Sequence, residues 1–333
     1  MTARSIDIVY ERTEEIRRLA LDAGFSRARF LTPFQPLSAA APLVPRGYEE
    51  GAPALLVVAL PYGNDDPDVR EEPSRPTATA PAEGPQPGGG ARIAPFARRN
   101  YYAEAVARLK AVAVELRKRH GGARSDYRIL CNSPIPEKPL AAACGLGSVG
   151  RNTLVITPEA GSLVILAAMT LPFPILADGP EARRSTENGT DQAGNFTVCG
   201  NCSACVAACP THALDGGALD RTRCIAWFAS GHGEPPPEVE AAWENRLYGC
   251  TVCQDVCPHN RRPIRGVATD RGALPAEMDA AELIAMTDDD LRAKFRGTAM
   301  GMAWLGPEAI RKNALSASLH LTARYRNSPS LYP

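Results

Sequence analysis

The sequence predicts an α+β protein that begins with an α/β domain, continues into a cysteine-rich module and ends in a short helical segment. Three observations support this prediction. Residues 54–62, ALLVVALPY, are apolar throughout and rich in Val and Leu, as in a strand buried on both faces. Eight of the ten cysteines lie between residues 199 and 257. Residues 287–321 carry the pattern of two or three helices.

The composition is that of an ordinary folded protein. The chain has 333 residues, which allows two or three domains, and 44% of them are hydrophobic. Lys+Arg and Asp+Glu balance at 37 each, so no global basic field favours nucleic acid. No apolar run is long enough to span a membrane, and residues 1–20 resemble an amphipathic helix rather than a signal peptide. We therefore expect a cytoplasmic monomer with no membrane partner.

The first half of the α/β domain is predicted to contain two long helices and one central strand. Residues 5–24 form a helix that ends at Gly24, and residues 54–62 form the buried strand. Residues 66–92 are rich in Pro, Gly and Ala, which predicts a mobile surface loop. A second helix follows at about 99–120, and the pair Gly121-Gly122 ends it.

The second half of this domain is predicted to consist of short elements. Residues 127–131, YRILC, form a short strand, and residues 139–144, PLAAAC, form a short helix that leads into a glycine loop. Residues 153–157 and 162–171 are expected to pair as a hairpin.

Polar segments divide the chain into the predicted parts, and Thr287 with Asp290 is a plausible capping box in the last of them. The boundaries are 1–176 for the α/β domain, 177–197 for a linker, 198–265 for the cysteine-rich module and 266–333 for the helical segment.

The cysteine spacing predicts two [4Fe–4S] clusters. The run CGNCSACVAACP has the bacterial ferredoxin pattern C-x2-C-x2-C-x3-C-P, in which the fourth Cys binds the other cluster. Three thiolates at i, i+3 and i+6 lie on one tight loop that can surround a corner of a cubane. A second run, C-x2-C-x3-C-P, and the isolated Cys224 complete eight ligands. The predicted sets are Cys199, Cys202, Cys205 and Cys257 for one cluster, and Cys209, Cys224, Cys250 and Cys253 for the other.

Two alternatives to the clusters are weaker. Structural zinc also uses C-x2-C pairs, but its four ligands come from two separated pairs rather than from three cysteines in one loop. A disulfide framework suits small secreted chains, and this chain is long enough to build its own core. The clusters would make the protein a carrier of single electrons.

Residues 145–150, GLGSVG, satisfy G-x-G-x-x-G, yet their context argues against a dinucleotide site. That fingerprint needs a strand before the glycines and a helix after them. Here a predicted helix precedes the glycines and a predicted strand follows. The glycines instead imply a close approach of the backbone to another segment or to a large cofactor.

The order of motifs along the chain resembles that of the epoxyqueuosine reductase family. The resemblance covers about residues 95–315 and rests on PLAAACGLGSVGRNTLVITPEAGS, CGNCSACVAACPTHAL, RCIAWF, RLYGCTVCQDVCPHN, KFRGT and IRKNAL. Members of this family resemble reductive dehalogenases and carry cobalamin in an N-terminal α/β domain, beside two [4Fe–4S] clusters. The resemblance implies a reductase whose clusters reduce cobalt. The expected substrate is the epoxide of a modified tRNA base, which is converted to queuosine.

The same resemblance assigns residues to the cofactors. The eight cysteines match the family's cluster ligands, and the glycine loop and the following hairpin match the segments that contact the corrin. A tyrosine pair and the stretch after Cys224 match further segments near the cofactor. The residues expected to bind cobalamin on this basis are Tyr102, Arg151, Asn152, Thr153, Gly161, Ser162 and Trp227.

The chain departs from the family at the expected proton donor. The family usually has an aspartate before the segment that ends in Ala-Gly-Leu-Gly, and here Cys131 and then Asn132 occupy that place. Cys131 is either a catalytic acid or a small packing residue, and we favour packing. A thiol with a pKa of about 8.5 can donate a proton at neutral pH. Glu137 is either an alternative acid or a solvated side chain after Pro136, and solvation is the commoner outcome.

These departures leave other functions open. An acidic position of the hairpin holds Ala167 or Ala168, and the segments at both ends are shorter than in the family, so a different substrate is credible. One alternative is an electron-transfer protein that reduces a corrinoid on another protein. A weaker alternative is a flavin-binding, ferredoxin-like reductase.

The expected partners are an electron donor and a nucleic acid. A low-potential donor of the ferredoxin or flavodoxin type would load the clusters. Arginines could meet tRNA phosphates or simply surround anionic clusters, and the sequence favours neither. They are Arg98, Arg99, Arg261, Arg262 and Arg265.

Overall fold

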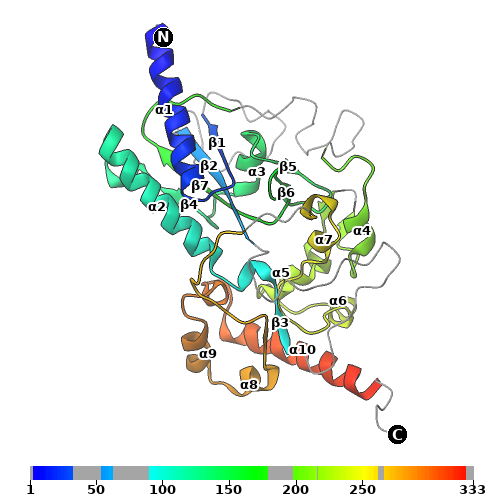
Figure 1. Ribbon diagram of the computed structural model, residues 1–333. Helices are drawn as coiled ribbons and strands as arrows, with labels where there is room; N and C mark the ends of the chain where they lie inside the picture. Colours follow the sequence, from blue (N-terminus) through cyan, green and yellow to red (C-terminus); the bar gives the residue numbers. More distant parts are fainter. Residues whose placement is uncertain are drawn as a thin grey trace.

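The computed structural model describes residues 3–32, 54–62, 90–178, 198–215, 217–261 and 266–327. Within them, α1 (Ala3–Asp22) and the C-terminal helix α10 (Pro307–Asn327) lie at opposite ends of the molecule (Figure 1). No helix in these ranges is long and apolar enough to cross a bilayer.

A four-stranded antiparallel sheet forms the centre of the N-terminal part. Its strand order is β1-β2-β7-β4, and β2 pairs with β7 over eight residue pairs, from Ala54 with Leu171 to Pro61 with Val164. Every residue of β2 is buried because the sheet is covered on both faces. The strands are β1 (Arg27–Leu31), β2 (Ala54–Pro61), β4 (Ile129–Leu130) and β7 (Val164–Leu171).

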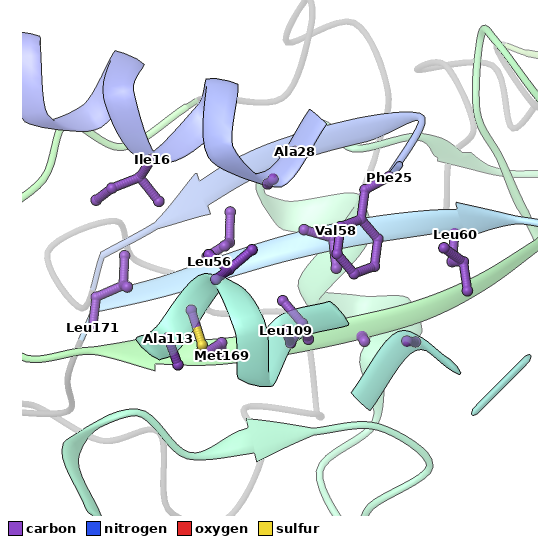
Figure 2. Packing of buried hydrophobic residues seen from close by; sticks show 14 of the residues in the cluster. Ile16, Phe25, Ala28, Leu56, Val58, Leu60, Leu109, Ala113, Met169 and Leu171 are labelled. Carbon is purple, nitrogen blue, oxygen red and sulfur yellow. The ribbon is translucent and has the colours of Figure 1, made fainter. Parts of the chain in front are cut away.

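One face of this sheet packs against α1 and α2 (Tyr101–His120). Ile16 from α1 and Leu109 from α2 are fully buried against Leu56 and Val58 of β2 (Figure 2). Side chains alternate between the two faces of a strand, so every second residue of β2 points to these helices. The Asn100 side chain begins α2 by accepting the N–H of Ala103, as an N-cap residue does.

The other face packs against α3 (Glu137–Ala143) and a small hairpin. Leu55 and Val57 of β2 contact Leu140 of α3 in a separate buried cluster. The hairpin pairs β5 (Ser148–Val149) with β6 (Val155–Ile156). A Cβ at Gly147 would lie 2.6 Å from the carbonyl oxygen of Ile156, so the glycine permits this close approach.

A second sheet joins distant parts of the chain. Strand β3 (Ala91–Ile93) lies between β10 (Arg246–Tyr248) and β11 (Glu277–Met278). Its buried residues pack with those of α10 and of two short helices, α8 (Ala280–Ala285) and α9 (Asp288–Phe295). Residues 91–97 thus share a core with the C-terminal segment, although they precede it by more than a hundred residues.

The cysteine-rich module consists of short elements between these two parts. Residues Ile225, Phe228, Val239 and Trp243 form its small apolar core, and Trp243 is fully buried. Its elements are α4 (Ala204–Ala208), β8 (Leu214–Asp215), β9 (Ala218–Leu219), α5 (Ile225–Ala229), α6 (Pro237–Ala241) and α7 (Val252–Asp255).

The structure confirms the predicted α+β class and most of the predicted elements. The helices at 5–24 and 99–120, the central strand and three C-terminal helices are present, and Thr287 caps α9 by accepting the N–H of Asp290. The expected hairpin of 153–157 with 162–171 is wrong. β6 pairs with β5, and β7 pairs with β2 and β4. An isolated bridge pairs Thr157 with Gly161, which precedes the second segment.

Two predicted loops fall largely outside the described residues. Of the loop predicted at 66–92, only residues 90–92 are described. Residues 91 and 92 belong to strand β3 rather than to a loop. The linker predicted at 177–197 is described only at its first two positions.

Candidate functional site

The first predicted cysteine set surrounds a cavity of about 50 Å³. Cys199, Cys202, Cys205 and Cys257 all line it, although Cys257 is far from the others in sequence. Within the described ranges, no three His, Cys, Asp or Glu side chains converge to hold a single metal ion. The four thiols are instead arranged around a space, and all ten cysteines are free thiols.

A loop of the α/β domain closes this cavity. The backbone N–H of Arg151 donates to Sγ of Cys199 at 3.4 Å, and its guanidinium Nη2 donates to the carbonyl oxygen of Gly200 at 3.2 Å. Arg151, Asn152 and Ile156 line the cavity beside the cysteines. The structure therefore places Arg151 and Asn152, which the family resemblance assigns to cobalamin, against the first cysteine set.

The second predicted set also gathers in space. Burial raises the pKa of both Cys224 and Cys250; the nearby charge of Cys209 adds to the shift of Cys224, and that of Cys224 adds to the shift of Cys250. Burial, then Cys250, Cys224 and Cys205, raise the pKa of Cys253 to about 12. The N–H of Ala213 donates to Sγ of Cys209 at 3.3 Å.

This electrostatic crowding suits iron ligation. The charge of Cys205 in the first set contributes to the raised pKa of Cys253 in the second, so the two sets lie close together. Several thiolates in one desolvated place repel one another, and bound iron supplies the positive charge that removes this cost. The backbone N–H groups that point to Cys199 and Cys209 are the kind of donor that surrounds iron–sulfur sulfur atoms.

A buried polar network fastens the cysteine-rich module to the α/β domain. Asn260 accepts the N–H of Ser162 at 2.8 Å through Oδ1 and donates to the Ser162 hydroxyl at 3.0 Å. Gln254 donates to the carbonyl oxygen of Ser162 and to the hydroxyl of Tyr62, both at 2.9 Å. Ser162 is only 4% exposed, and Gly161 lies directly against His259 and Asn260.

Gly161 and Ser162 thus contact the cysteine loop, and their expected contact with the corrin stays a prediction. Sequence reasoning did not single out Gln254 or Asn260. The available signal was their position, since Gln254 follows Cys253 directly and Asn260 is three residues after Cys257.

A group of three side chains, Tyr102, Cys131 and Glu137, lies on the α/β side of the molecule. Burial raises the pKa of all three side chains, and the charges of Cys131 and Glu137 raise that of Tyr102 further. All three nevertheless keep some solvent access. Side chains that are desolvated and still accessible suit contact with a ligand. The ring of Tyr102 packs edge-on against Trp304, with centroids 6.4 Å apart.

Cys131 has the environment of a packing residue. Its Sγ faces the carbonyl oxygens of Tyr102 and Leu166 at 3.9 and 3.8 Å. Burial, and then the charge of Glu137, raise the pKa of Cys131 to about 12. A thiol with this pKa gives up its proton reluctantly at neutral pH, which favours the packing interpretation over the acid.

Glu137 differs from the expected solvated side chain, and that expectation was wrong. The side chain is partly buried, and its Oε1 accepts the N–H of Ser133 at 3.2 Å. Burial raises the pKa of Glu137, although hydrogen bonds from backbone N–H groups oppose the shift. The carboxyl therefore lies folded against the loop 131–133, in which Asn132 has a positive φ of 51°.

Lys138 connects this group to the second cysteine set. Burial and then the charge of Arg221 lower the pKa of Lys138, while Cys224 opposes the shift. Its Nζ donates to the carbonyl oxygen of Thr153 at 3.1 Å. Thr153, expected at the cofactor, thus lies beside Lys138, which sequence reasoning did not single out.

Trp227 lies partly buried near the second cysteine set. The ring of His232 stacks on it with centroids 3.6 Å apart, and the guanidinium of Arg221 lies 5.0 Å from its centre. The N–H of Trp227 donates to the carbonyl oxygen of Cys224 at 3.0 Å. The site thus combines an aromatic surface with positive charge.

The arginines that could meet tRNA are only partly described. Arg98 and Arg99 donate to the carbonyl oxygens of Ile93 and Leu274, and Arg261 is exposed. Arg262 and Arg265 lie outside the described residues.

Comparison with known proteins identifies the cysteine-rich module. Residues 198–260 match a family model described as a 4Fe-4S double cluster binding domain. This match assigns two [4Fe–4S] clusters to the module, as the cysteine spacing predicts, rather than zinc.

The chain also resembles epoxyqueuosine reductases in sequence. The enzyme of Staphylococcus aureus is 32% identical over 192 residues, which are 56% of this chain and 45% of the relative. That of Aliivibrio fischeri is 38% identical over 138 residues, 40% of this chain and 33% of the relative. The alignments therefore span less than half the length of these curated relatives.

Solved structures share the fold. A selenomethionine-labelled epoxyqueuosine reductase has a TM-score of 0.71 at 24% identity, over 94% of this chain and 82% of that chain. An epoxyqueuosine reductase bound to an epoxyqueuosine-modified tRNA stem loop has a TM-score of 0.67 at 24% identity, with the same coverage.

Proposed function

We propose, because the chain belongs to the epoxyqueuosine reductase family, that it is an iron–sulfur and cobalamin-dependent reductase that converts epoxyqueuosine in tRNA to queuosine. The observation that carries the proposal is the spatial order of the redox groups. Helix α4, which carries Cys205 of the first set, packs against α7, which carries Cys253 of the second, and the charge of Cys224 of the second set acts on Lys138. Lys138 directly follows Glu137, which belongs to the accessible group with Tyr102 and Cys131.

This order gives electrons a direction. The first cavity is bordered by the exposed residue His259, and its ligand Cys199 is followed by the exposed Gly200, so an external low-potential donor could reach this side. Electrons would pass from the first cluster to the second and then toward the group of Tyr102, Cys131 and Glu137. A reductase with a ferredoxin or flavodoxin type donor fits this arrangement.

The residues around Tyr102 fit cobalamin, which the family resemblance implies. The Tyr102 hydroxyl has no hydrogen-bond partner among the described residues, and the side chain remains accessible although burial raises its pKa. Tyr102, Lys138 and Trp227 would hold the cofactor beside the second cluster. Bound cobalamin would supply a cobalt centre that takes up single electrons and becomes a strong nucleophile.

Glu137 is the carboxyl that we assign as the proton source. Removing an epoxide oxygen as water takes two electrons and two protons. The two clusters each carry one electron, and a carboxyl with a raised pKa holds a proton nearer to neutral pH than an ordinary glutamate. Glu137 would thereby take the role of the family's aspartate, whose place Cys131 and Asn132 occupy in this chain.

The proposed partner is tRNA, and the proposed compartment is the cytoplasm. A related structure holds a modified tRNA stem loop. In this chain, the exposed Arg221 places a positive charge over the ring of Trp227, where a phosphate would gain from it.

The test uses anaerobically reconstituted full-length protein with iron, sulfide and cobalamin. It is incubated with a reductant and an epoxyqueuosine-modified tRNA stem loop, and queuosine is measured by nucleoside mass spectrometry. Formation of queuosine that depends on cobalamin supports the proposal. A protein that holds both clusters and cobalamin but leaves the epoxide unchanged refutes it.

A second candidate is a protein that passes electrons to a corrinoid on another protein or reduces a different small substrate. The absence of a carboxylic acid at Cys131 favours it. Rapid reduction of an added free corrinoid, together with an untouched tRNA, would select this candidate.

A further inference from the structure

Asn152 occupies an unusual position for a polar side chain. It is only 4% exposed, and it lines the first cavity together with Cys199, Cys202, Cys205 and Cys257. It belongs to the α/β domain and lies outside the residues that match the two-cluster module. A buried amide normally has hydrogen-bond partners on both its oxygen and its nitrogen.

The hydrogen bonds of Asn152 fix the direction of its amide. Its Oδ1 accepts the N–H of Leu154 at 3.2 Å, so the oxygen faces the backbone of its own loop. The Nδ2 atom is buried and has no hydrogen-bond partner among the described residues. Leaving such a donor unpaired in a buried place is unfavourable, so a hydrogen-bond acceptor in the cavity is the simplest explanation.

We propose that Asn152 donates an N–H···S hydrogen bond to the [4Fe–4S] cluster held by Cys199, Cys202, Cys205 and Cys257, and thereby raises its reduction potential. The proposal rests on the cluster alone and needs neither cobalamin nor tRNA. It makes a side chain of the α/β domain part of the environment of a cluster in the next module.

The neighbouring residue supports this geometry. The backbone N–H of Arg151 already donates to Sγ of Cys199 at 3.4 Å, so this loop presents donors to the sulfur atoms of the site. Ile156, an apolar residue of the following strand β6, lines the same cavity. The loop thus supplies donors at two successive positions.

The direction of the effect follows from charge. Reduction adds one negative charge to the cluster, and an N–H dipole directed at sulfur stabilises the more negative state. The site is partly enclosed, which strengthens this stabilisation relative to water. Asn152 therefore makes the first cluster easier to reduce by the donor.

The experiment measures the midpoint potentials of both clusters in the full-length protein without cobalamin or tRNA. A redox titration followed by electron paramagnetic resonance resolves the two clusters. Asn152→Asp is the main variant because it keeps the shape and the acceptor for Leu154 but replaces the donor by an oxygen. Asn152→Leu removes the donor without adding charge. Ile156→Val is the matched control because it changes the same cavity without a polar atom.

The expected result is that one midpoint shifts to a lower potential in both Asn152 variants and more in Asn152→Asp, while the other midpoint stays. Ile156→Val should leave both midpoints in place. Unchanged midpoints in Asn152→Asp with both clusters bound would overturn the proposal, as would an equal shift in Ile156→Val. Loss of one cluster from Asn152→Asp alone would also overturn it, because Asn152 would then retain the cluster rather than tune it.

Discussion

The side-chain amide of Asn260 donates a hydrogen bond of 3.0 Å to the hydroxyl of Ser162, which lies 98 residues earlier in the chain. The same amide also donates to the carbonyl oxygen of Gln254 at 2.8 Å and accepts the N–H of Ser162 through Oδ1. One asparagine thus satisfies groups on both the α/β domain and the loop between Cys253 and Cys257. This contact therefore fastens the loop that carries Cys253 and Cys257 to the α/β domain.

Asn260→Ala should loosen the cysteine loop. The substitution leaves the N–H of Ser162 unpaired in a buried place, at a cost of about 1–3 kcal/mol. It also removes one of two hydrogen bonds to the carbonyl oxygen of Gln254, which still accepts the N–H of Cys257. If the loop opens locally, iron should pass to a chelator about 5- to 150-fold faster. The measurement is the rate of iron release under anaerobic conditions.

A double-mutant cycle with Ser162→Ala checks that this effect comes from the pair. Residues in one hydrogen-bond network are coupled, so the double variant should release iron more slowly than the sum of the two effects predicts. Strictly additive effects would contradict the structural account of Asn260.

Gly161→Ala should disturb the same contact by steric clash. A Cβ at Gly161 would lie 2.6 Å from the carbonyl oxygen of His259 and also against Asn260, and the backbone of that loop cannot yield without moving Cys257. We expect a lower melting temperature and less iron per chain. Gly297→Ala is the matched control, since it also has a positive φ, 79° against 56°, but its Cβ would meet no described atom within 4 Å. An equal effect of both variants would show that only backbone strain matters.

The sequence predicted the elements better than their partners. The apolar run at 54–62 and the helical spacing at 99–120 indicate burial, and both elements are present. The pairing of β6 with β5 depends on Gly147, whose missing side chain lets Ile156 approach. Periodicity contains no information about which strand lies next to which, so the expected hairpin of 153–157 with 162–171 was wrong.

The candidate site shows the same limit. Cysteine spacing grouped the thiols that line the first cavity, because ligand geometry on a short loop is local. The partnership of Asn260 with Ser162 is not local and left no pattern in the sequence. The burial of Glu137 was also missed, since it depends on how residues 131–136 fold back over α3.

Glu137→Gln should remove a proton donor while it keeps the shape of the side chain. A catalytic acid contributes about 10²–10⁴-fold, so we expect a fall in turnover of that size with the epoxyqueuosine-modified stem loop. Because the pKa of Glu137 is raised, wild-type turnover should fall as pH rises through that pKa, and the variant should lack this limb. Cys131→Ala should change turnover little, since its thiol has a pKa of about 12.

Stability provides a separate readout for Glu137. A carboxyl with a raised pKa binds its proton more tightly in the folded state, so its contribution is complete below the unfolded pKa and is lost as pH rises through the folded one. The stability of the wild type relative to Glu137→Gln should therefore decline over that range. A constant difference would mean that the carboxyl is solvated after all.

Cys205→Ser should remove one cluster, whereas Cys144→Ala should remove none. Cys205 lines the first cavity and feels the charges of Cys199 and Cys257, so an alcohol in its place deprives that cluster of a thiolate. Cys144 is fully buried among the apolar residues of α3 and the sheet, and its pKa is raised to about 12 by burial. Iron and sulfide analysis of reconstituted protein should give about eight irons for the wild type and for Cys144→Ala, and about four for Cys205→Ser. Eight irons in Cys205→Ser would show that this thiol is no ligand, and the assignment of the four cysteines around the cavity would fail.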